Sequence, residues 1–373
     1  MKKEVEQLKQ ALEIAKSKLQ VAEKAKIKDQ NPHCSKHVLP AVHLFPYRWN
    51  LKDAVFTKDK GKVFSCFACG GGSTMGYKLA GFDVIGCNEI DPKMIEAYKT
   101  NHNPKYAFLE PIQTFKNRTD LPKELYELDI LDGSPPCSNF SMAGNREKDW
   151  GKEKKFREGQ SLQVLDTLFF DFIDLAKKLQ PKIVIAENVK GLLLGNAITY
   201  VREIYRQFDL AGYYCQHFLL DASKMGVPQK RERVFFIAMR KDLATPFLYQ
   251  KDMFTIMPKL NLSFKEKEIP IKEFATGKQK KETQNYTESR FGDVMLNLNK
   301  ASNTLATDIN RYWLDENTLI DENTTKMIGS YPIDYNFLEN NLQYLIGMSV
   351  PPVMVAQIAS EIYVQWLAKI HCA

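Results

Sequence analysis

The sequence lacks any long hydrophobic run. No stretch approaches the ~18 consecutive apolar residues of a membrane span, and the charged residues after Met1 do not lead into the apolar core of a secretory signal. The seven cysteines are an odd number scattered over 373 residues, which argues against a disulfide framework and for reduced thiols. These absences predict a cytoplasmic protein with no membrane association.

A strong charge of one sign is also lacking. Lys and Arg number 52 against 45 Asp and Glu, a net charge of +7, which permits a polyanionic partner without requiring one. Hydrophobic residues make up 44% of the chain, which is enough to bury a large core and excludes the disordered class.

The first segment of the chain, residues 1–30, is expected to be a helical arm. Its apolar residues follow a heptad-like spacing at Val5, Leu8, Leu12, Ala15, Leu19 and Ala22. Such a helix could support a homodimer, but three heptads with two alanines are marginal as a coiled coil, so helix packing or a frayed arm is favoured. The prolines at 32, 40 and 46 then predict an irregular connector over 31–61.

From residue 62, short apolar runs alternate with helical stretches. The runs Val63–Phe67, Val84–Cys87, Leu128–Leu131 and Ile183–Ala186 each precede glycine or an acidic residue, and helical spacing over 162–179 separates the last two. This alternation predicts an α/β, Rossmann-like fold with a parallel sheet and helices on both faces. Ligands in such folds bind at the carboxyl ends of the strands, where the polar residues fall.

A glycine-rich turn follows the first predicted strand. Gly70, Gly71 and Gly72 open a helix, where backbone can approach a ligand closely and the helix N-terminus favours polar groups. Glu89, about 20 residues further on at the end of the next run, suits the hydroxyls of a ribose. The alternative is that the glycines form an ordinary structural turn and that Glu89 is an ordinary surface residue.

Three further motifs carry reactive groups. Pro135 and Pro136 stiffen the backbone before Cys137, which presents a thiol on a rigid loop. Glu187 ends a strand beside Asn188, where partial burial would let it act as an acid, and a structural Glu is the alternative. Alternation along a strand lets Arg231 and Arg233 share a face with Gln229, unless this is only an exposed charged turn.

These motifs, in this order, resemble those of the DNA cytosine-5 methyltransferase family of bacterial and phage type. The matching segments are Phe67 to Gly71, Pro136-Cys137, Glu187-Asn188-Val189, Gln229 to Arg233 and Gly347 to Pro352. The resemblance covers about residues 62–240 and 300–365, and five spaced motifs in order are far more specific than any one alone.

The resemblance implies methylation of C5 of a flipped cytosine in double-stranded DNA, with S-adenosyl-L-methionine as cofactor. Cys137 would attack C6, Glu187 would hydrogen-bond N3, Arg233 would hold O2, and Arg231 would steady this catalytic site. Ser141, Asn188 and Gln229 would support the substrate. The positions that match cofactor contacts are Phe67, Gly71, Gly72, Glu89, Ile90, Ile112, Pro136, Leu168, Ser349 and Val350.

The resemblance also divides the chain: a catalytic domain at 62–240, a small target-recognition domain at 241–300 and a C-terminal segment, 301–373, that returns to the catalytic domain. The recognition domain would read base edges with residues such as Gln284, Asn285, Arg290 or Asn297. The protein would serve restriction-modification or act as an orphan or phage methylase. Methylation of tRNA and a catalytically silent DNA-binding relative are the alternatives.

Some positions depart from the family pattern. Cys69 replaces a loop glycine, Ser65 stands where an acidic residue is common, and Ser138 and Met348 replace a glutamine and an asparagine. Glu110-Pro111 replaces a Gly-Asp pair, so Asp91 or a backbone group would have to recognise adenine.

The spacing of Cys34, His37, Cys66 and Cys69 imitates a zinc site. Because Cys66 and Cys69 belong to the cofactor strand and turn, no metal is expected.

Overall fold

A computed structural model describes residues 45–136, 153–154, 163–164, 167–252, 255–275, 293–307, 311–315 and 318–372. The chain divides into two compact units, Met1–Pro40 and Ala41–Ala373, and all described residues belong to the second. The predicted helical arm, residues 31–44 of the connector, Cys137, Ser138 and Ser141 lie outside the described residues. The same holds for Cys34, His37, Gln284, Asn285 and Arg290.

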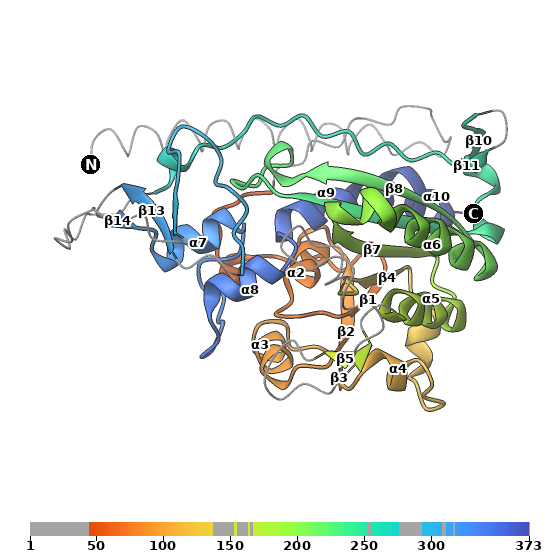
Figure 1. The fold of residues 1–373 in the computed structure, drawn as a ribbon. Coiled ribbons are helices and arrows are strands. Elements are labelled where there is room, and N and C mark those ends of the chain that lie inside the picture. Colours follow the sequence, from red (N-terminus) through yellow and green to blue (C-terminus); the bar gives the residue numbers. More distant parts are fainter. Residues whose placement is uncertain are drawn as a thin grey trace, which may run out of the picture. The chain divides into compact units, whose positions relative to one another are not determined.

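A seven-stranded sheet forms the centre of the second unit, with the order β3-β2-β1-β4-β7-β9-β8 (Figure 1). The pairs from β3 to β7 are parallel, as the alternating pattern predicts. Its strands are β1 (Lys62–Cys66), β2 (Asp83–Glu89), β3 (Tyr106–Leu109), β4 (Ile130–Gly133), β7 (Ile183–Val189), β8 (Tyr213–Asp221) and β9 (Glu232–Arg240).

The strand β9, which was not among the four runs that predict the parallel sheet, pairs antiparallel with both β7 and β8. Residues 222–231 connect β8 to β9, and this connection is shorter than the roughly dozen residues of a parallel crossover. The chain therefore turns back, and β9 inserts between its two neighbours.

Helices cover both faces of the sheet. Side chains of α4, α5 and α6 share one hydrophobic core with Phe64, Leu131 and Val184, whereas α2 and α9 pack with Val63 and Ile130 on the other face. In Figure 1, α5 and α6 lie side by side next to β7. These helices, with α3 beside β2 and β3, are α2 (Gly72–Leu79), α3 (Pro92–His102), α4 (Ile112–Phe115), α5 (Leu168–Leu179), α6 (Ile198–Leu210) and α9 (Pro352–Ile362).

The C-terminal stretch Leu342–Cys372 is long and apolar enough to cross a membrane by length and composition alone, the one such stretch in the described part of the chain. In its most apolar window, 89% is buried inside the fold. The stretch is also interrupted, because Ser349 and Pro351 separate helices. It is composed of α8 (Leu342–Met348), α9, the π-helix η10 (Tyr363–Leu367) and α10 (Ala368–Cys372), and it packs as core helices do.

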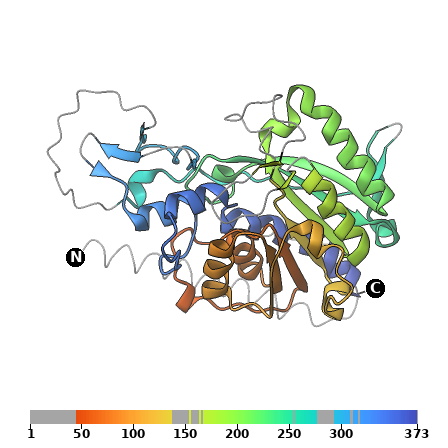
Figure 2. The same cartoon turned by 60° about the horizontal axis from the view of Figure 1, so that its bottom comes forward.

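The segment 241–300, expected to be a recognition domain, contributes to two cores. Phe247, Leu260 and Leu262 pack on the main sheet, whereas Ile271 and later residues join a second core with α7 and α8. Asp293–Met295, Arg311–Asp315 and Thr318–Leu319 form a separate three-stranded sheet, whose blue strands lie apart from the main sheet in Figure 2. The elements of this part are β10 (Leu248–Gln250), β11 (Ile256–Pro258), β12 (Asp293–Met295), β13 (Arg311–Asp315), β14 (Thr318–Leu319) and α7 (Glu322–Ile328).

Short elements complete the described residues: two 2-residue strands, β5 (Glu153–Lys154) and β6 (Gln163–Val164), and 3₁₀ turns at Leu51–Asp53, Lys123–Tyr126, Lys190–Leu193, Gly195–Ala197, Ala222–Lys224, Lys241–Leu243, Thr245–Phe247 and Ile271–Glu273.

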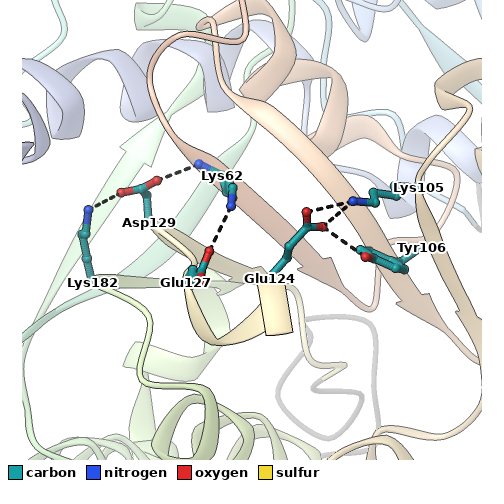
Figure 3. Close-up of polar contacts among 7 residues, drawn as sticks. All are labelled: Lys62, Lys105, Tyr106, Glu124, Glu127, Asp129 and Lys182. Carbon is teal, nitrogen blue, oxygen red and sulfur yellow. Dashed lines mark hydrogen bonds and ion pairs between the residues drawn. The ribbon is translucent and has the colours of Figure 1, made fainter. Parts of the chain in front are cut away.

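Asp129 ties together the amino ends of three sheet strands and the C-terminal helix. Its carboxylate accepts hydrogen bonds from the Lys62 N–H and the Lys182 ammonium, each at 2.7 Å (Figure 3). His371 of α10 lies 2.7 Å from the same carboxylate. Although burial raises the pKa of Asp129, the Lys182 and His371 contacts hold it below its ordinary value. This edge is opposite the one where the sequence predicts the site.

Candidate active site at the carboxyl ends of the strands

The turn between β1 and α2 is held by Glu89. The Cys69 N–H donates to Glu89 Oε2 at 2.7 Å, and the Ile90 and Asp91 N–H groups donate to Oε1 at 2.8 and 2.9 Å. Burial raises the pKa of Glu89, although these amide donors lower it. The carboxyl predicted to bind a ribose therefore also fixes the loop, in which Phe67 and Cys69 adopt positive φ angles.

Close contacts explain why this loop contains glycines. A Cβ on Gly71 would lie 2.1 Å from His102 Nε2, and one on Gly72 would lie 2.4 Å from the Tyr331 hydroxyl oxygen. The Tyr335 hydroxyl donates to the Gly70 carbonyl. The loop thus lies directly against protein, and neither Gly71 nor Gly72 has room for a side chain.

The C-terminal motif lies against the same loop. A Cβ on Gly72 would be 2.7 Å from the Val350 carbonyl oxygen and 3.0 Å from Ser349 Cβ. Ser349 is buried, and its hydroxyl donates to the Leu345 carbonyl at 2.8 Å. The fold therefore places Ser349 and Val350, two of the predicted cofactor positions, against Gly72 of the glycine-rich turn.

The remaining predicted cofactor positions fall into two groups. Phe67, Ile90 and Pro136 are half-buried and follow β1, β2 and β4, three neighbouring strands. Ile112 and Leu168 are buried in the core under α4 and α5. The half-buried group presents apolar surface at one edge of the sheet, whereas the buried pair belongs to the hydrophobic core.

Asn188 anchors the loop that leads to Cys137. Its side-chain amide donates to the Pro135 carbonyl at 3.1 Å, while its oxygen accepts the Val189 N–H at 2.9 Å. Asn188 is buried. This contact brings Pro135, which precedes the Pro-Cys motif, to the end of β7.

Glu187 and Arg233 form an ion pair at this edge. Arg233 Nε lies 3.0 Å from Glu187 Oε1, and both side chains are less than one fifth exposed. Burial lowers the pKa of Arg233 and Glu187 partly restores it. The antiparallel register places Glu187 opposite Phe235 and Val189 opposite Arg233, so the pair is diagonal across two strands.

Arg231 and Gln229 face the interior. The Arg231 guanidinium donates to the Gly347 carbonyl at 2.8 Å and the Leu305 carbonyl at 3.4 Å, and burial, then Arg233, lowers its pKa to about 9. Gln229 donates to the Ile328 carbonyl and accepts the Leu305 N–H, each at 3.3 Å. Both side chains join the start of β9 to the second core.

Sequence reasoning assigned no role to a buried carboxyl in this region, that of Asp132. The Ser65 hydroxyl donates to Asp132 Oδ2 at 2.7 Å, and the Tyr77 hydroxyl donates to Oδ1 at 3.0 Å. Burial raises the pKa of Asp132 to about 7, although Ser65 and Tyr77 lower it. The sequence signal that could have indicated this residue is an acidic side chain at the end of an apolar run that forms a buried strand.

Comparison with known proteins identifies the family. The model of the C-5 cytosine-specific DNA methylase family matches residues 61–336, which is most of the chain. The chain belongs to this family. This result agrees with the resemblance carried by the five motifs. The matched residues include parts of both the main sheet and the second core.

Individual relatives support the assignment. Type II methyltransferase M.FnuDI of Fusobacterium nucleatum is 36% identical over 182 residues, which cover 49% of this chain and 48% of the relative. Type II methyltransferase M.NgoPII of Neisseria gonorrhoeae is 33% identical over 199 residues, 52% of each chain. The chain thus spans about half the length of these curated relatives. The crystal structure of S. pombe Dnmt2 methyltransferase has the same fold, with a TM-score of 0.54, 15% identity and coverage of 81% of this chain and 98% of that chain.

One departure from the family pattern, Glu110, and the nearby Asp91 have structural partners. Glu110 pairs with Arg118 at 3.0 Å, and its carbonyl accepts the Asn88 amide at 2.8 Å. Asp91 Oδ1 accepts the Lys93 and Met94 N–H groups and caps α3. Asp91, one of the two expected substitutes for adenine recognition, therefore also has a structural role as the cap of α3.

Proposed function

We propose that this protein transfers a methyl group from S-adenosyl-L-methionine to C5 of a flipped cytosine in double-stranded DNA. Family membership supports the reaction class. The observation that carries the proposal is the half-buried Glu187–Arg233 pair at 3.0 Å, beside the Asn188 amide that holds Pro135. A carboxyl and a guanidinium at the end of the loop that carries Cys137 suit the ring nitrogen and carbonyl of a pyrimidine.

In this mechanism the Cys137 thiolate bonds to C6 of cytosine, and the electrons of the C5–C6 double bond move toward C5 and N3. Glu187, through Oε2, would hydrogen-bond and protonate N3, because Arg233 contacts Oε1. Arg233 Nη2 would hold O2, since Nη1 donates to the Glu232 carbonyl at 2.8 Å. After C5 has gained the methyl group, its proton passes to solvent water, the C5–C6 double bond forms again as the bond to the Cys137 sulfur breaks, and N3 returns its proton to Glu187.

The residues present fit the cofactor. S-adenosyl-L-methionine, when bound, supplies an electrophilic methyl group on a sulfonium. Phe67, Ile90 and Pro136 offer half-buried apolar surface to an adenine at adjacent strand ends, and the loop that Glu89 fixes through Cys69 offers backbone groups. Gly71 and Gly72 let this loop pack tightly enough to keep its shape.

Exposed lysines beside the site suit a DNA backbone. Lys224 pairs with Glu268 at 2.7 Å, and Lys230 and Lys300 also lower the pKa of Glu268. Three cations around one carboxylate leave a positive surface where the start of β9 meets the second core. Phosphate contacts of this kind supply affinity without sequence specificity.

In the decisive experiment, the full chain is incubated with duplex DNA that contains 5-fluorocytosine. Transfer of labelled methyl groups to unlabelled tRNA and to DNA with ordinary cytosine is assayed in parallel. The fluorine at C5 prevents the final elimination, so the native protein should form a covalent complex. Cys137→Ala should abolish it, whereas Cys372→Ala, which changes an exposed thiol, should not.

Trapping that survives Cys137→Ala would reject the nucleophile. Methylation of tRNA without DNA would replace the substrate, and cofactor-dependent DNA binding without methyl transfer would indicate a catalytically silent relative. Bisulfite sequencing of DNA from expressing cells would then give the target site of an active enzyme.

A further inference from the structure

Asp132 is a buried carboxyl that the proposed chemistry does not use. It belongs to β4, a few residues before Cys137, and lies in register with Ser65 of β1. Its two oxygens accept the Ser65 and Tyr77 hydroxyls at 2.7 and 3.0 Å. All three side chains are more than nine-tenths buried, so these contacts are made away from water.

The two residues at the end of β4 are fixed from opposite faces of the sheet. Asp132 faces the side of α2, because it bonds to Tyr77 of that helix. Gly133 faces α5, where an added Cβ would lie 2.5 Å from the Phe172 ring. Pro135 is then held by Asn188. The segment leading to Cys137 is therefore anchored at successive positions.

The Asp132 contacts reach the other half of the site as well. Tyr77 belongs to α2, whose first residues form the glycine loop, and Ser65 belongs to the strand that enters this loop. One carboxyl is thus bonded to both elements that flank the loop and stands on the strand that leads to the nucleophile.

We propose that Asp132 is a positioning residue for methyl transfer, whose carboxylate holds β1 and α2 against β4 and so fixes the glycine loop relative to the Cys137 loop. This inference rests on the proposed function for the role of the two loops. A change at Asp132 would act through the placement of cofactor and nucleophile, since nothing in the contacts above requires it to touch either.

The charge state of Asp132 should affect this anchor. An ionised carboxylate accepts both hydroxyls, whereas a protonated carboxyl adds a hydrogen for which Ser65 and Tyr77 must rearrange. With burial as the main cause, the pKa of Asp132 rises to about 7, and Glu187 contributes to the rise. The Asp132 charge in turn raises the pKa of Cys66 on β1, Tyr77 on α2 and Tyr98 on α3. None of these four neighbours is a cation.

The test compares Tyr77→Phe, Asp132→Ala and Asp132→Asn in the full chain. Tyr213→Phe is the matched control, because Tyr213 is a buried phenol that donates to the Pro181 carbonyl at 2.8 Å on another strand. Calorimetry gives the Kd for S-adenosyl-L-methionine at pH 6 and pH 8, and steady-state assays give kcat and KM separately.

We expect Tyr77→Phe and Asp132→Ala to weaken cofactor binding by about tenfold, as for loss of a hydrogen bond to a charged group, and Tyr213→Phe to leave it unchanged. The native protein should bind more weakly at pH 6 than at pH 8. Asp132→Asn, which like the protonated carboxyl has one acceptor and one donor group, should bind at both pH values about as weakly as the native protein does at pH 6 and lose the pH dependence.

Equal effects of Tyr77→Phe and Tyr213→Phe, or the same pH profile in native protein and Asp132→Asn, would overturn the positioning role. If the native protein binds cofactor but transfers no methyl group to DNA or tRNA, the proposed function fails instead. The binding measurements then still decide whether Asp132 fixes the loop.

Discussion

The buried Asp132 carboxyl should make the protein less stable as the pH rises. Its pKa rises from an ordinary 3.8 to about 7 in the folded protein, so the folded state binds the proton more tightly than the unfolded state. Stability is therefore unaffected below about pH 4, falls between about pH 4 and 7 and is lowest above pH 7, by about 4 kcal/mol. Asp132→Asn removes this penalty and costs about 1 kcal/mol in altered hydrogen bonds.

Urea denaturation of native protein and Asp132→Asn at about pH 5.5 and 8 would measure this effect. The variant should gain stability relative to the native protein as the pH rises, by about 2 kcal/mol between these two conditions. Glu203→Gln is the control, because the Arg206 hydrogen bond lowers the pKa of Glu203 to about 2, far below the range tested. A difference between native and Asp132→Asn that stays constant with pH would refute the reasoning.

Three other expectations concern charge and assembly. Lys230→Ala and Lys300→Ala should each reduce the slope of log affinity for duplex DNA against log salt by about 0.9, whereas Lys241→Ala, at the opposite end of β9, should not change it. Asp129→Asn should lower the free energy of unfolding at pH 7 by about 1–2 kcal/mol. This loss should disappear below pH 3.8, as acid protonates the carboxyl of the native protein. Chemical denaturation at both pH values measures the two effects. If residues 1–28 dimerise the protein, their deletion should shift sedimentation to that of a monomer, and an unchanged value would reject dimerisation.

Most of the sheet could be predicted because its signals are local. The runs before Gly70, Glu89, Asp132 and Glu187 become β1, β2, β4 and β7, since buried parallel strands read as short apolar segments bounded by polar residues. The reversal at β9 could not be read this way. It depends on the length of the 222–231 connection and on a vacant place beside β7, which is a property of the assembled sheet.

The same distinction applies to the site. Motif order predicted that Glu187, Arg233 and the loop before Cys137 meet, and the structure joins the first two by an ion pair. Composition could not reveal that Glu89 and Asp91 also hold backbone N–H groups. Hydrogen bonds of this kind depend on loop geometry that becomes definite only when neighbouring strands are in place.

The position of the buried carboxyl also gives meaning to a departure from the family pattern. Ser65 stands where an acidic residue is common, and the register of β1 with β4 places Asp132 directly opposite it. The Ser65 hydroxyl is 2.7 Å from Asp132 Oδ2, so carboxyls on both strands would meet without an intervening cation, at a high energetic cost. A serine on β1 is therefore the partner that an acidic residue on β4 requires. The chain keeps one buried carboxyl beneath the glycine loop and supplies it from the strand that leads to Cys137.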